Sequence, residues 1–199
     1  MMKIILASQS PRRRELLERM GIRKFEICPA RGEEVAEPGM APDRLVNALS
    51  RQKAAEVALQ AEWEDLIIAA DTVVAIDGMI LGKPTDERAA EEMLRRLSGR
   101  SHQVYTGLTL RRGSDIRTQH EQTEVRFRPL SWEEIRAYVA TGEPMDKAGA
   151  YGIQGYGAML VEGISGDFYN VMGLPVCRLR RMLKEFGVDP LVDRGGVGD

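Results

Sequence analysis

Apolar residues along the chain occur both in short continuous runs and in stretches with helical spacing. The runs 3–7 and 66–76 are mainly apolar, which is typical of strands buried on both faces of a sheet. Between them, apolar side chains recur every three or four residues and predict a helix over 43–62. Strands that alternate with amphipathic helices favour an α/β fold.

Capping and turn residues set the expected boundaries of further elements. Ser10 suits an N-cap and Pro11 the first helical position, so a helix should run to about residue 20. Ser131 and Glu134 form a capping box that predicts a helix to about residue 140. Other predicted elements are strands at 25–28, 102–111, 117–128 and 158–164, a turn at 77–78 leading to a strand at 79–81, and helices at 86–97 and 175–186.

The expected architecture is therefore α/β, with a mixed central sheet flanked by helices and an antiparallel component in the middle. A length of 199 residues fits one domain, or two small lobes that share a core. We expect the domain to span 1–188 and residues 189–199 to form a flexible tail, because Gly195 and Gly196 lie near the end.

Composition and charge exclude several classes of protein. With 43% hydrophobic and 29% charged residues and a net charge of -2, the chain lacks the basic excess typical of nucleic-acid binders. No apolar run approaches the length of a membrane span, and the arginines near the start follow the apolar run, the reverse of a signal peptide. The two cysteines lie outside any CxxC pattern, as in reduced proteins. We expect a cytoplasmic protein with no nucleic-acid or membrane partner.

The segment 8–14, Ser-Gln-Ser-Pro-Arg-Arg-Arg, lies where a strand is followed by a helix N-terminus. Free N–H groups and the helix dipole attract anions there, so three arginines in the first turn oppose the dipole, each at about 0.3–1 kcal/mol. A bound phosphate chain would reverse this, because arginines, serine hydroxyls and amides could all bind one polyanion. The alternative is a solvated basic patch.

Two further segments carry charged groups in unusual settings. Asp71 interrupts an apolar strand, which indicates either a carboxylate that binds a metal or works in a site, or a structural Asp with a satisfied partner. The segment 78–84 resembles a phosphate-binding P-loop, but its spacing is one residue short and Pro84 replaces the Ser or Thr that would contact magnesium. That excludes a Walker-type kinase or ATPase and leaves Lys83 as a phosphate contact or a solvated turn lysine.

Residues 146–157 combine glycines with tyrosines, which indicates either backbone in close approach to a ligand or a tight surface loop. Glu33 and Glu34 could bind a hard cation or simply be solvated. The chain has two histidines, and neither is near a cysteine or a glutamate pair, which argues against zinc.

Taken together, these segments resemble the Maf family of nucleotide pyrophosphatases, which is distantly similar in fold to the inosine triphosphatases. The similarity spans about 3–187 and rests on an ordered series of motifs: Ser8-x-Ser10-Pro11-Arg12-Arg13, Lys53, Ala70-Asp71-Thr72, Gly82-Lys83-Pro84, Ser98-Gly99, His102, Thr106-Gly107, Asp146-Lys147-Ala148-Gly149-Ala150-Tyr151, Ile153-Gln154-Gly155 and Gly173-Leu174-Pro175. Two of these motifs, Asp146-Lys147-Ala148-Gly149-Ala150-Tyr151 and Ile153-Gln154-Gly155, resemble the branch acting on dTTP and UTP. A sister branch acting on 7-methyl-GTP has Glu where Gln154 stands.

The resemblance implies hydrolysis of dTTP and UTP to the monophosphate and pyrophosphate, in a cleft between two lobes, with magnesium or manganese. It implies that Asp71 is the catalytic proton acceptor and that Arg12, Thr72 and Gln154 govern substrate choice. The full expected set for substrate binding is Ser8, Ser10, Arg12, Arg13, Lys53, Thr72, Lys83, Lys147 and Gln154; for metal it is Glu33, Glu34 and Asp71.

The expected role is the removal of unwanted or modified nucleotides. Because the family is also linked to septum formation, a regulatory binding protein without turnover stays open, although an intact carboxylate set argues against it. A phosphotransferase is opposed by the broken Walker spacing. The sequence leaves the oligomeric state open, a homodimer included.

Overall fold

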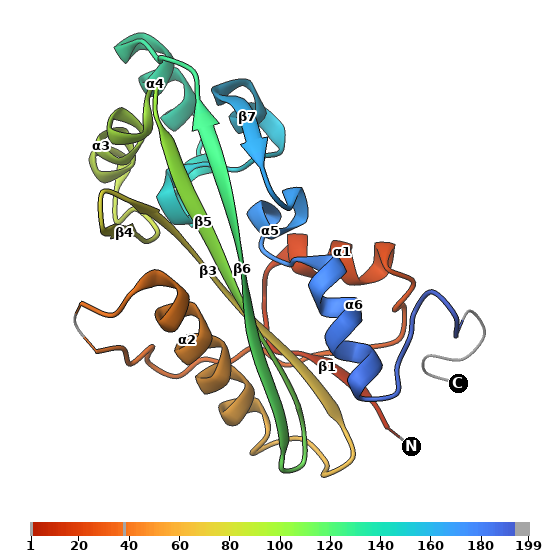
Figure 1. Ribbon diagram of the computed structural model, residues 1–199. Coiled ribbons are helices and arrows are strands. Elements are labelled where there is room, and N and C mark those ends of the chain that lie inside the picture. The colour runs from red at the N-terminus through yellow and green to blue at the C-terminus, as the bar shows by residue number, and fades with distance from the viewer. Residues whose placement is uncertain (1, 38, 194–199) are drawn as a thin grey trace. The chain divides into compact units, whose positions relative to one another are not determined.

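The structure is a computed structural model that describes residues 2–37 and 39–193 (Figure 1). Its strands are β1 (Ile4–Leu6), β2 (Glu26–Ile27), β3 (Leu66–Ile76), β4 (Met79–Leu81), β5 (Ser101–Arg112), β6 (Asp115–Phe127) and β7 (Val161–Ser165). Its α-helices are α1 (Pro11–Arg19), α2 (Pro42–Val57), α3 (Glu87–Leu97), α4 (Trp132–Val139), α5 (Phe168–Met172) and α6 (Val176–Glu185), and its 3-10 helices are η1 (Glu143–Asp146), η2 (Ala148–Ala150) and η3 (Gly155–Leu160).

The strands form a seven-stranded sheet in the order β2-β1-β3-β5-β6-β7, with β4 paired to β3. Strand β1 runs parallel to β2 and to β3, whereas the pairs β3–β4 and β6–β7 are antiparallel. The predicted α/β class with a mixed sheet flanked by helices is therefore confirmed.

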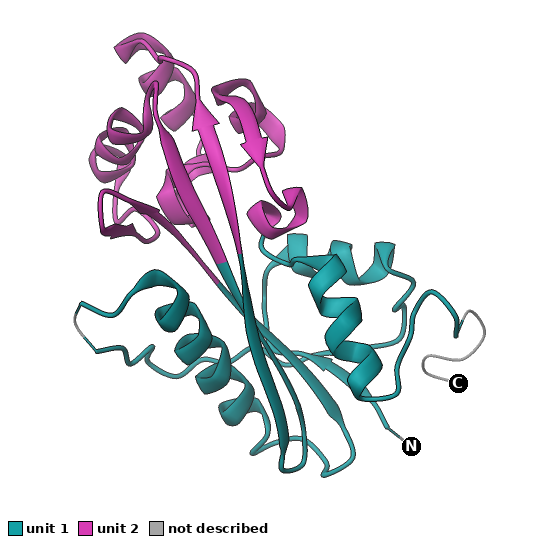
Figure 2. Cartoon of the chain, in the orientation of Figure 1, with its two compact units in different colours: residues 1–71, 106–121, 173–199 teal, residues 72–105, 122–172 magenta. Residues whose placement is uncertain are grey.

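The described chain divides into two compact units (Figure 2). Unit 1 comprises 1–71, 106–121 and 173–199, and unit 2 comprises 72–105 and 122–172. Strands β3, β5 and β6 each contribute residues to both units. The predicted domain over 1–188 stays a prediction. Of the predicted tail, residues 194–199 lie outside the described residues, and Asp189 forms an ion pair with Arg180 at 2.8 Å.

The core of unit 1 lies on both faces of its strands. On one face, Ile5 and Ile67 pack with Ala54 and Val57 of α2. The intervening strand residues point to the opposite face, which α1 and α6 cover (Figure 1). At Gly107 of β5, an added Cβ would lie 2.2 Å from the carbonyl oxygen of Val46, so only glycine allows α2 to approach the strand this closely.

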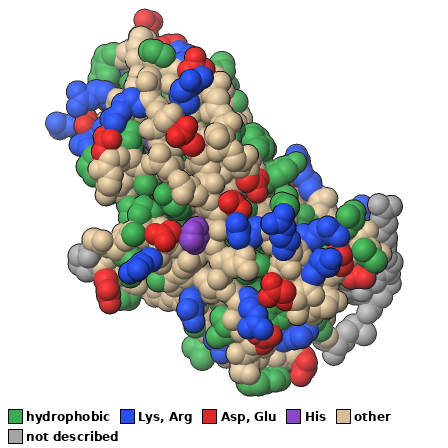
Figure 3. All heavy atoms as spheres, in the orientation of Figure 1, with side chains coloured by type: hydrophobic (Ala, Val, Ile, Leu, Met, Phe, Trp, Pro, Cys, Tyr) green, Lys and Arg blue, Asp and Glu red, His purple; other side chains and the backbone are tan. Residues whose placement is uncertain are grey.

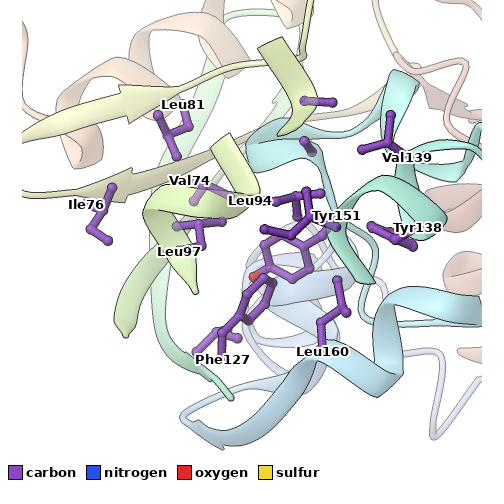
Figure 4. Close-up of a cluster of buried hydrophobic side chains, with 14 of the residues drawn as sticks. Val74, Ile76, Leu81, Leu94, Leu97, Phe127, Tyr138, Val139, Tyr151 and Leu160 are labelled. Atoms are coloured by element: carbon purple, nitrogen blue, oxygen red, sulfur yellow. The ribbon is translucent and has the colours of Figure 1, made fainter. Parts of the chain in front are cut away.

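The core of unit 2 is a cluster of aliphatic and aromatic side chains from β3, α3, α4 and the segments around them (Figure 4). The rings of Phe127 and Tyr151 pack edge to face at 4.7 Å. His102 is fully buried beside them, and its Nε2 lies 2.8 Å from the Tyr151 hydroxyl. Burial lowers the pKa of His102 to about 4, so this histidine is neutral in the folded protein at neutral pH.

Most predicted boundaries are confirmed. The Ser10 hydroxyl accepts the N–H of Arg13 at the start of α1, and the capping box of Ser131 and Glu134 is present at α4. The turn before β4 has positive φ at both central residues, 51° at Asp77 and 74° at Gly78, as a tight hairpin requires.

Two predicted elements need correction. The strand expected over 158–164 begins only at Val161, because residues 155–160 form η3, whose first N–H groups donate to the Glu143 side chain and not to a neighbouring strand. The helix expected over 43–62 ends at Val57, and beyond it the N–H groups of Leu59 and Gln60 bond three residues back and tighten the last turn. Helix α5 was not predicted.

No helix within residues 2–37 and 39–193 has both the length and the apolar character needed to cross a membrane. Both cysteines are free, and Cys177 is exposed.

Candidate functional site

In unit 1, Lys53 lies between two carboxylates. Its Nζ contacts Asp71 Oδ1 and lies 2.9 Å from Glu34 Oε1. The side chains of Asp71 and Lys53 are only 10% and 19% exposed, whereas that of Glu34 is 55% exposed. The carboxylate that interrupts the apolar strand β3 is therefore paired with an ammonium, which offsets the cost of its burial.

The loop that carries Glu34 is fixed by two side chains of α2. The Glu56 carboxylate accepts the N–H groups of Arg31 at 2.7 Å and Gly32 at 3.0 Å. The amide oxygen of Gln52 accepts the N–H of Val35 at 3.2 Å, and its NH₂ group donates to the carbonyl of Glu33. Gln52, Lys53 and Glu56 lie within about one turn of the helix. The same turn of α2 thus holds the loop and presents Lys53 to its carboxylates.

Arg13 of α1 is bonded within unit 1 through its guanidinium group. Its Nε donates to the carbonyl of Gly173 at 2.8 Å, and one terminal nitrogen donates to Ser8 Oγ at 3.2 Å and to the carbonyl of Ala70 at 2.9 Å. Burial lowers the pKa of Arg13, and the nearby Asp71 carboxylate opposes that effect. Because Ala70 directly precedes Asp71, Arg13 fixes the backbone of β3 beside the paired carboxylate.

This arrangement changes the interpretation of the arginines at the start of α1. The unfavourable interaction of Arg13 with the helix dipole is offset, because its guanidinium donates hydrogen bonds to three acceptors inside the protein. Ser8 Oγ also accepts the N–H of Ser10 at 3.2 Å, so both serines order the turn before the helix. Arg14 is exposed and pairs with Glu18, and Arg12 is partly exposed.

Lys and Arg side chains are interspersed with Asp and Glu over α1 and α6 on the face drawn in Figure 3. Exposed pairs on α1, such as Arg19 with Glu15 at 2.6 Å, account for part of this mixture. The first turn of α1 is therefore not part of a uniformly basic surface.

The resemblance implies three metal ligands, Glu33, Glu34 and Asp71. Within the described residues, no three His, Cys, Asp or Glu side chains gather closely enough to hold a metal ion. The assignment of Glu33, Glu34 and Asp71 as metal ligands stays a prediction. Glu34 and Asp71 nevertheless each place an oxygen at one cation, the Lys53 ammonium. Two carboxylate oxygens fit a hard cation such as magnesium whose other ligands come from phosphate.

Four of the predicted residues lie in unit 2: Thr72, Lys83, Lys147 and Gln154. Thr72 and Gln154 are partly exposed, and Lys83 is exposed in the loop after β4. The carbonyl of Gly82 in that loop accepts the N–H of Gly149 at 3.0 Å, which connects it to η2.

Glu143 holds the segment on which Lys147 and Gln154 lie. Its carbonyl accepts the Lys147 ammonium at 2.6 Å, and the Asp146 carboxylate accepts the same group at 2.7 Å. The Glu143 carboxylate accepts the N–H groups of Tyr156 and Gly157, each at 2.9 Å. Sequence reasoning missed Glu143, and its only local signal was an acidic residue just before a glycine-rich segment.

The glycines of this segment are required by packing inside unit 2. An added Cβ would lie 2.8 Å from the Val74 side chain at Gly149, 2.8 Å from Lys147 at Gly152, and 2.0 Å from the Gly152 carbonyl oxygen at Gly157. All three glycines are buried. The contacts that demand glycine are therefore made by the protein itself, a third explanation beside a ligand and a surface loop.

The structure thus brings most of the predicted residues into three clusters, two in unit 1 and one in unit 2. In unit 1, Lys53, Glu34 and Asp71 form one cluster, and Ser8, Ser10 and Arg13 form another next to Ala70. In unit 2, Glu143 accepts the Lys147 ammonium and also the N–H of Tyr156, two residues after Gln154.

Comparison with known proteins places these residues in a family. The model of the family described as Maf-like protein matches residues 3–186. A dTTP/UTP pyrophosphatase of Symbiobacterium thermophilum is 51% identical over 198 residues, covering 100% of both chains. One of Bacillus velezensis is 51% identical over 186 residues, covering 94% of this chain and 97% of the relative. Among solved structures, the Staphylococcus aureus Ham1 protein is similar with 14% identity and a TM-score of 0.48, covering 80% of this chain and 79% of that one.

Proposed function

The chain belongs to the Maf family, and on this basis we propose that it hydrolyses dTTP and UTP to the nucleoside monophosphate and pyrophosphate. Relatives with 51% identity over nearly the whole chain bear the name of that activity. The observation that carries the proposal is the buried Asp71 carboxylate, held on an apolar strand by Lys53 with Glu34 beside it. A pure binding protein has no need of such a group, whereas hydrolysis needs a general base.

In this reaction, a water oxygen bonds to the α-phosphorus while the bond from that phosphorus to the pyrophosphate oxygen breaks. Asp71 orients the water and accepts its proton. Lys53 fixes the orientation of the Asp71 carboxylate, and Arg13 fixes the strand backbone next to it. Arg12, Lys83 and Lys147 bind the phosphate oxygens, and their charge stabilises the departing pyrophosphate.

Glu34 and Asp71 would hold a magnesium or manganese ion together with phosphate oxygens, because their carboxylates already converge on one cation. Such an ion supplies positive charge that neutralises the phosphate oxygens. Glu33, whose carbonyl bonds to Gln52, would support the loop. A cytoplasmic location, where both cysteines stay reduced, and a role in removing unwanted nucleotides are parts of the same proposal.

Gln154 would read the base. A primary amide offers one acceptor oxygen and an NH₂ donor, which complement the carbonyl and N3–H of uracil and thymine, and Thr72 would contribute to the same choice. A carboxylate offers acceptors alone and suits the adjacent donors of guanine. A mismatched edge leaves buried polar groups unpaired, at a cost of about 1–3 kcal/mol.

The test is to incubate the purified protein and magnesium with UTP, dTTP, CTP and GTP and to identify the products by phosphorus NMR. We expect pyrophosphate and monophosphate, fastest from UTP and dTTP. Release of orthophosphate would reject the proposal, and tight nucleotide binding without turnover would support a regulatory binding protein. A parallel reaction in chelator should stop and should resume on addition of magnesium or manganese.

A further inference from the structure

The segment that carries Gln154 is fixed by hydrogen bonds on both sides of that residue. After it, the N–H groups of Tyr156 and Gly157 donate to the Glu143 carboxylate, each at 2.9 Å. Before it, the N–H of Gly152 donates to the hydroxyl of Tyr138 at 3.2 Å. The carboxylate and the phenol therefore hold the backbone at three points close to Gln154.

These two side chains also bond to each other. Tyr138 lies on α4, is 5% exposed, and donates its hydroxyl hydrogen to Glu143 Oε1 at 2.9 Å. Burial raises the pKa of Tyr138, so its hydroxyl keeps the proton that it donates. The phenol thereby connects the Gly152 side of the segment to the Tyr156 side through one chain of hydrogen bonds.

The fit between Glu143 and the segment leaves little room for movement. An added Cβ at Gly155 would lie 2.5 Å from Glu143 Oε2, and one at Gly157 would lie 2.8 Å from the Tyr138 hydroxyl. Hydrogen-bonded groups packed this closely to glycine backbone restrict the positions available to the segment.

Glu143 also fixes Lys147. Its carbonyl accepts the lysine ammonium at 2.6 Å, and the methylene groups of that lysine lie next to Gly152. One residue thus sets the position of a lysine proposed to bind phosphate and of a glutamine proposed to read the base.

We propose that Glu143 and Tyr138 are positioning residues that determine base preference, by holding Gln154 where its amide can pair with the uracil or thymine edge and with no other. This inference rests on the proposed function. Discrimination by hydrogen bonding requires that the donor and acceptor cannot shift to suit a wrong partner, since a mismatch then leaves them unpaired. A segment released from Glu143 and Tyr138 would adjust to other bases and would have to be ordered again at each binding event.

The experiment compares the wild type with Glu143→Gln and Tyr138→Phe. The first keeps the size of the side chain but places an NH₂ group where N–H groups now donate, and the second removes only the hydroxyl. We expect the ratio of kcat/KM for UTP to that for GTP to fall about tenfold in each variant, the effect of losing one well-placed hydrogen bond. The KM for UTP should rise more than kcat falls, because the loss concerns binding and not the general base.

Matched controls carry the same chemical changes at other places in unit 2. Glu162→Gln alters a glutamate on β7 that is 50% exposed and pairs with Arg126, and Tyr169→Phe alters a tyrosine on α5 that is 40% exposed. Both controls should keep the wild-type ratio. An unchanged ratio in Glu143→Gln and Tyr138→Phe, or equal slowing with UTP and GTP, would overturn the inference.

Amide hydrogen exchange gives a second test that needs no activity and no variant. The N–H groups of Tyr156 and Gly157 should exchange slowly in the wild type, although Tyr156 is 58% exposed, because Glu143 accepts both. Fast exchange of both would overturn the inference. A wild type that cleaves neither UTP nor dTTP would instead reject the proposed function, and the base preference would then be measured as the ratio of dissociation constants for UTP and GTP in the same proteins.

Discussion

Replacement of Arg13 by alanine tests whether this arginine stabilises the fold or serves only to bind substrate. The sequence alone suggests that loss of an arginine from the first turn of α1 should stabilise the free protein, since positive charge opposes the helix dipole there. The structure predicts the opposite, because the partly buried guanidinium donates to Ser8, Ala70 and Gly173.

The size of the effect follows from these bonds. A hydrogen bond from a charged donor contributes about 1.5–3 kcal/mol, and water that enters the vacated space recovers part of this. Removing the charge from the first turn returns about 0.3–1 kcal/mol. The balance for Arg13→Ala is a loss of about 2–4 kcal/mol in the free energy of unfolding. At this chain length, such a loss lowers the melting temperature by about 5–15 °C.

Urea unfolding followed by circular dichroism measures this difference in the absence of nucleotide. Arg14→Ala is the matched control, because Arg14 stands in the same turn but is exposed and pairs with Glu18 at the surface. That exposed pair contributes about 0.3–0.5 kcal/mol, so the control should be close to the wild type. If Arg13→Ala proves as stable as Arg14→Ala, the three internal bonds do not stabilise the fold and the reasoning fails.

Four further outcomes are expected. Asp71→Asn should lower turnover about 10²–10⁴-fold while the fold survives, since an amide cannot accept the proton, and a near wild-type rate would remove Asp71 from the mechanism. Gln154→Glu should lower the preference for UTP over GTP in kcat/KM about tenfold, and equal slowing of both would make Gln154 merely structural. Gly157→Ala should destabilise the protein in thermal unfolding by at least about 2 kcal/mol, because its Cβ would lie 2.0 Å from the carbonyl of Gly152. In the wild type, the free energy of unfolding should fall by about 3 kcal/mol between pH 6.5 and 4, because the unfolded His102 binds a proton in this range and the buried one does not. His102→Gln should remove most of this fall, and equal slopes of stability against pH in urea unfolding would refute the reasoning.

The sequence predicts elements whose signals are local. The cap of Ser10 before Pro11, the capping box at Ser131 and the positive-φ turn at 77–78 each depend on residues within a few positions of one another. The 11 residues of β3 could be assigned because a continuous apolar run has one simple explanation in an α/β chain. Asp71 stands out for the same reason, as the one charged residue in that run.

Contacts between distant residues had no such signal. Arg13 has an acceptor 160 residues away along the chain, at Gly173, and Glu56 accepts N–H groups 24 and 25 residues away. The expected start of the strand predicted over 158–164 was wrong for a related reason, whereas the strand itself is present from Val161. The backbone before Val161 donates to Glu143, 13 and 14 residues earlier, and an apolar pattern cannot reveal a side-chain acceptor at that distance.

Glu56 in unit 1 and Glu143 in unit 2 each fix an irregular backbone segment in the same way. Each carboxylate accepts two consecutive backbone N–H groups, those of Arg31 and Gly32 in one case and those of Tyr156 and Gly157 in the other. Each segment held in this way carries a side chain with a proposed role, Glu34 or Gln154. Irregular segments of this kind are ordinarily the mobile parts of a protein, whereas catalysis and recognition need fixed groups. Hydrogen bonds to a charged acceptor are among the strongest available. A carboxylate on or beside a helix therefore restricts the motion of the segment whose N–H groups it accepts. It follows that changes at these two glutamates should alter kinetic constants while the helices that bear or precede them stay folded.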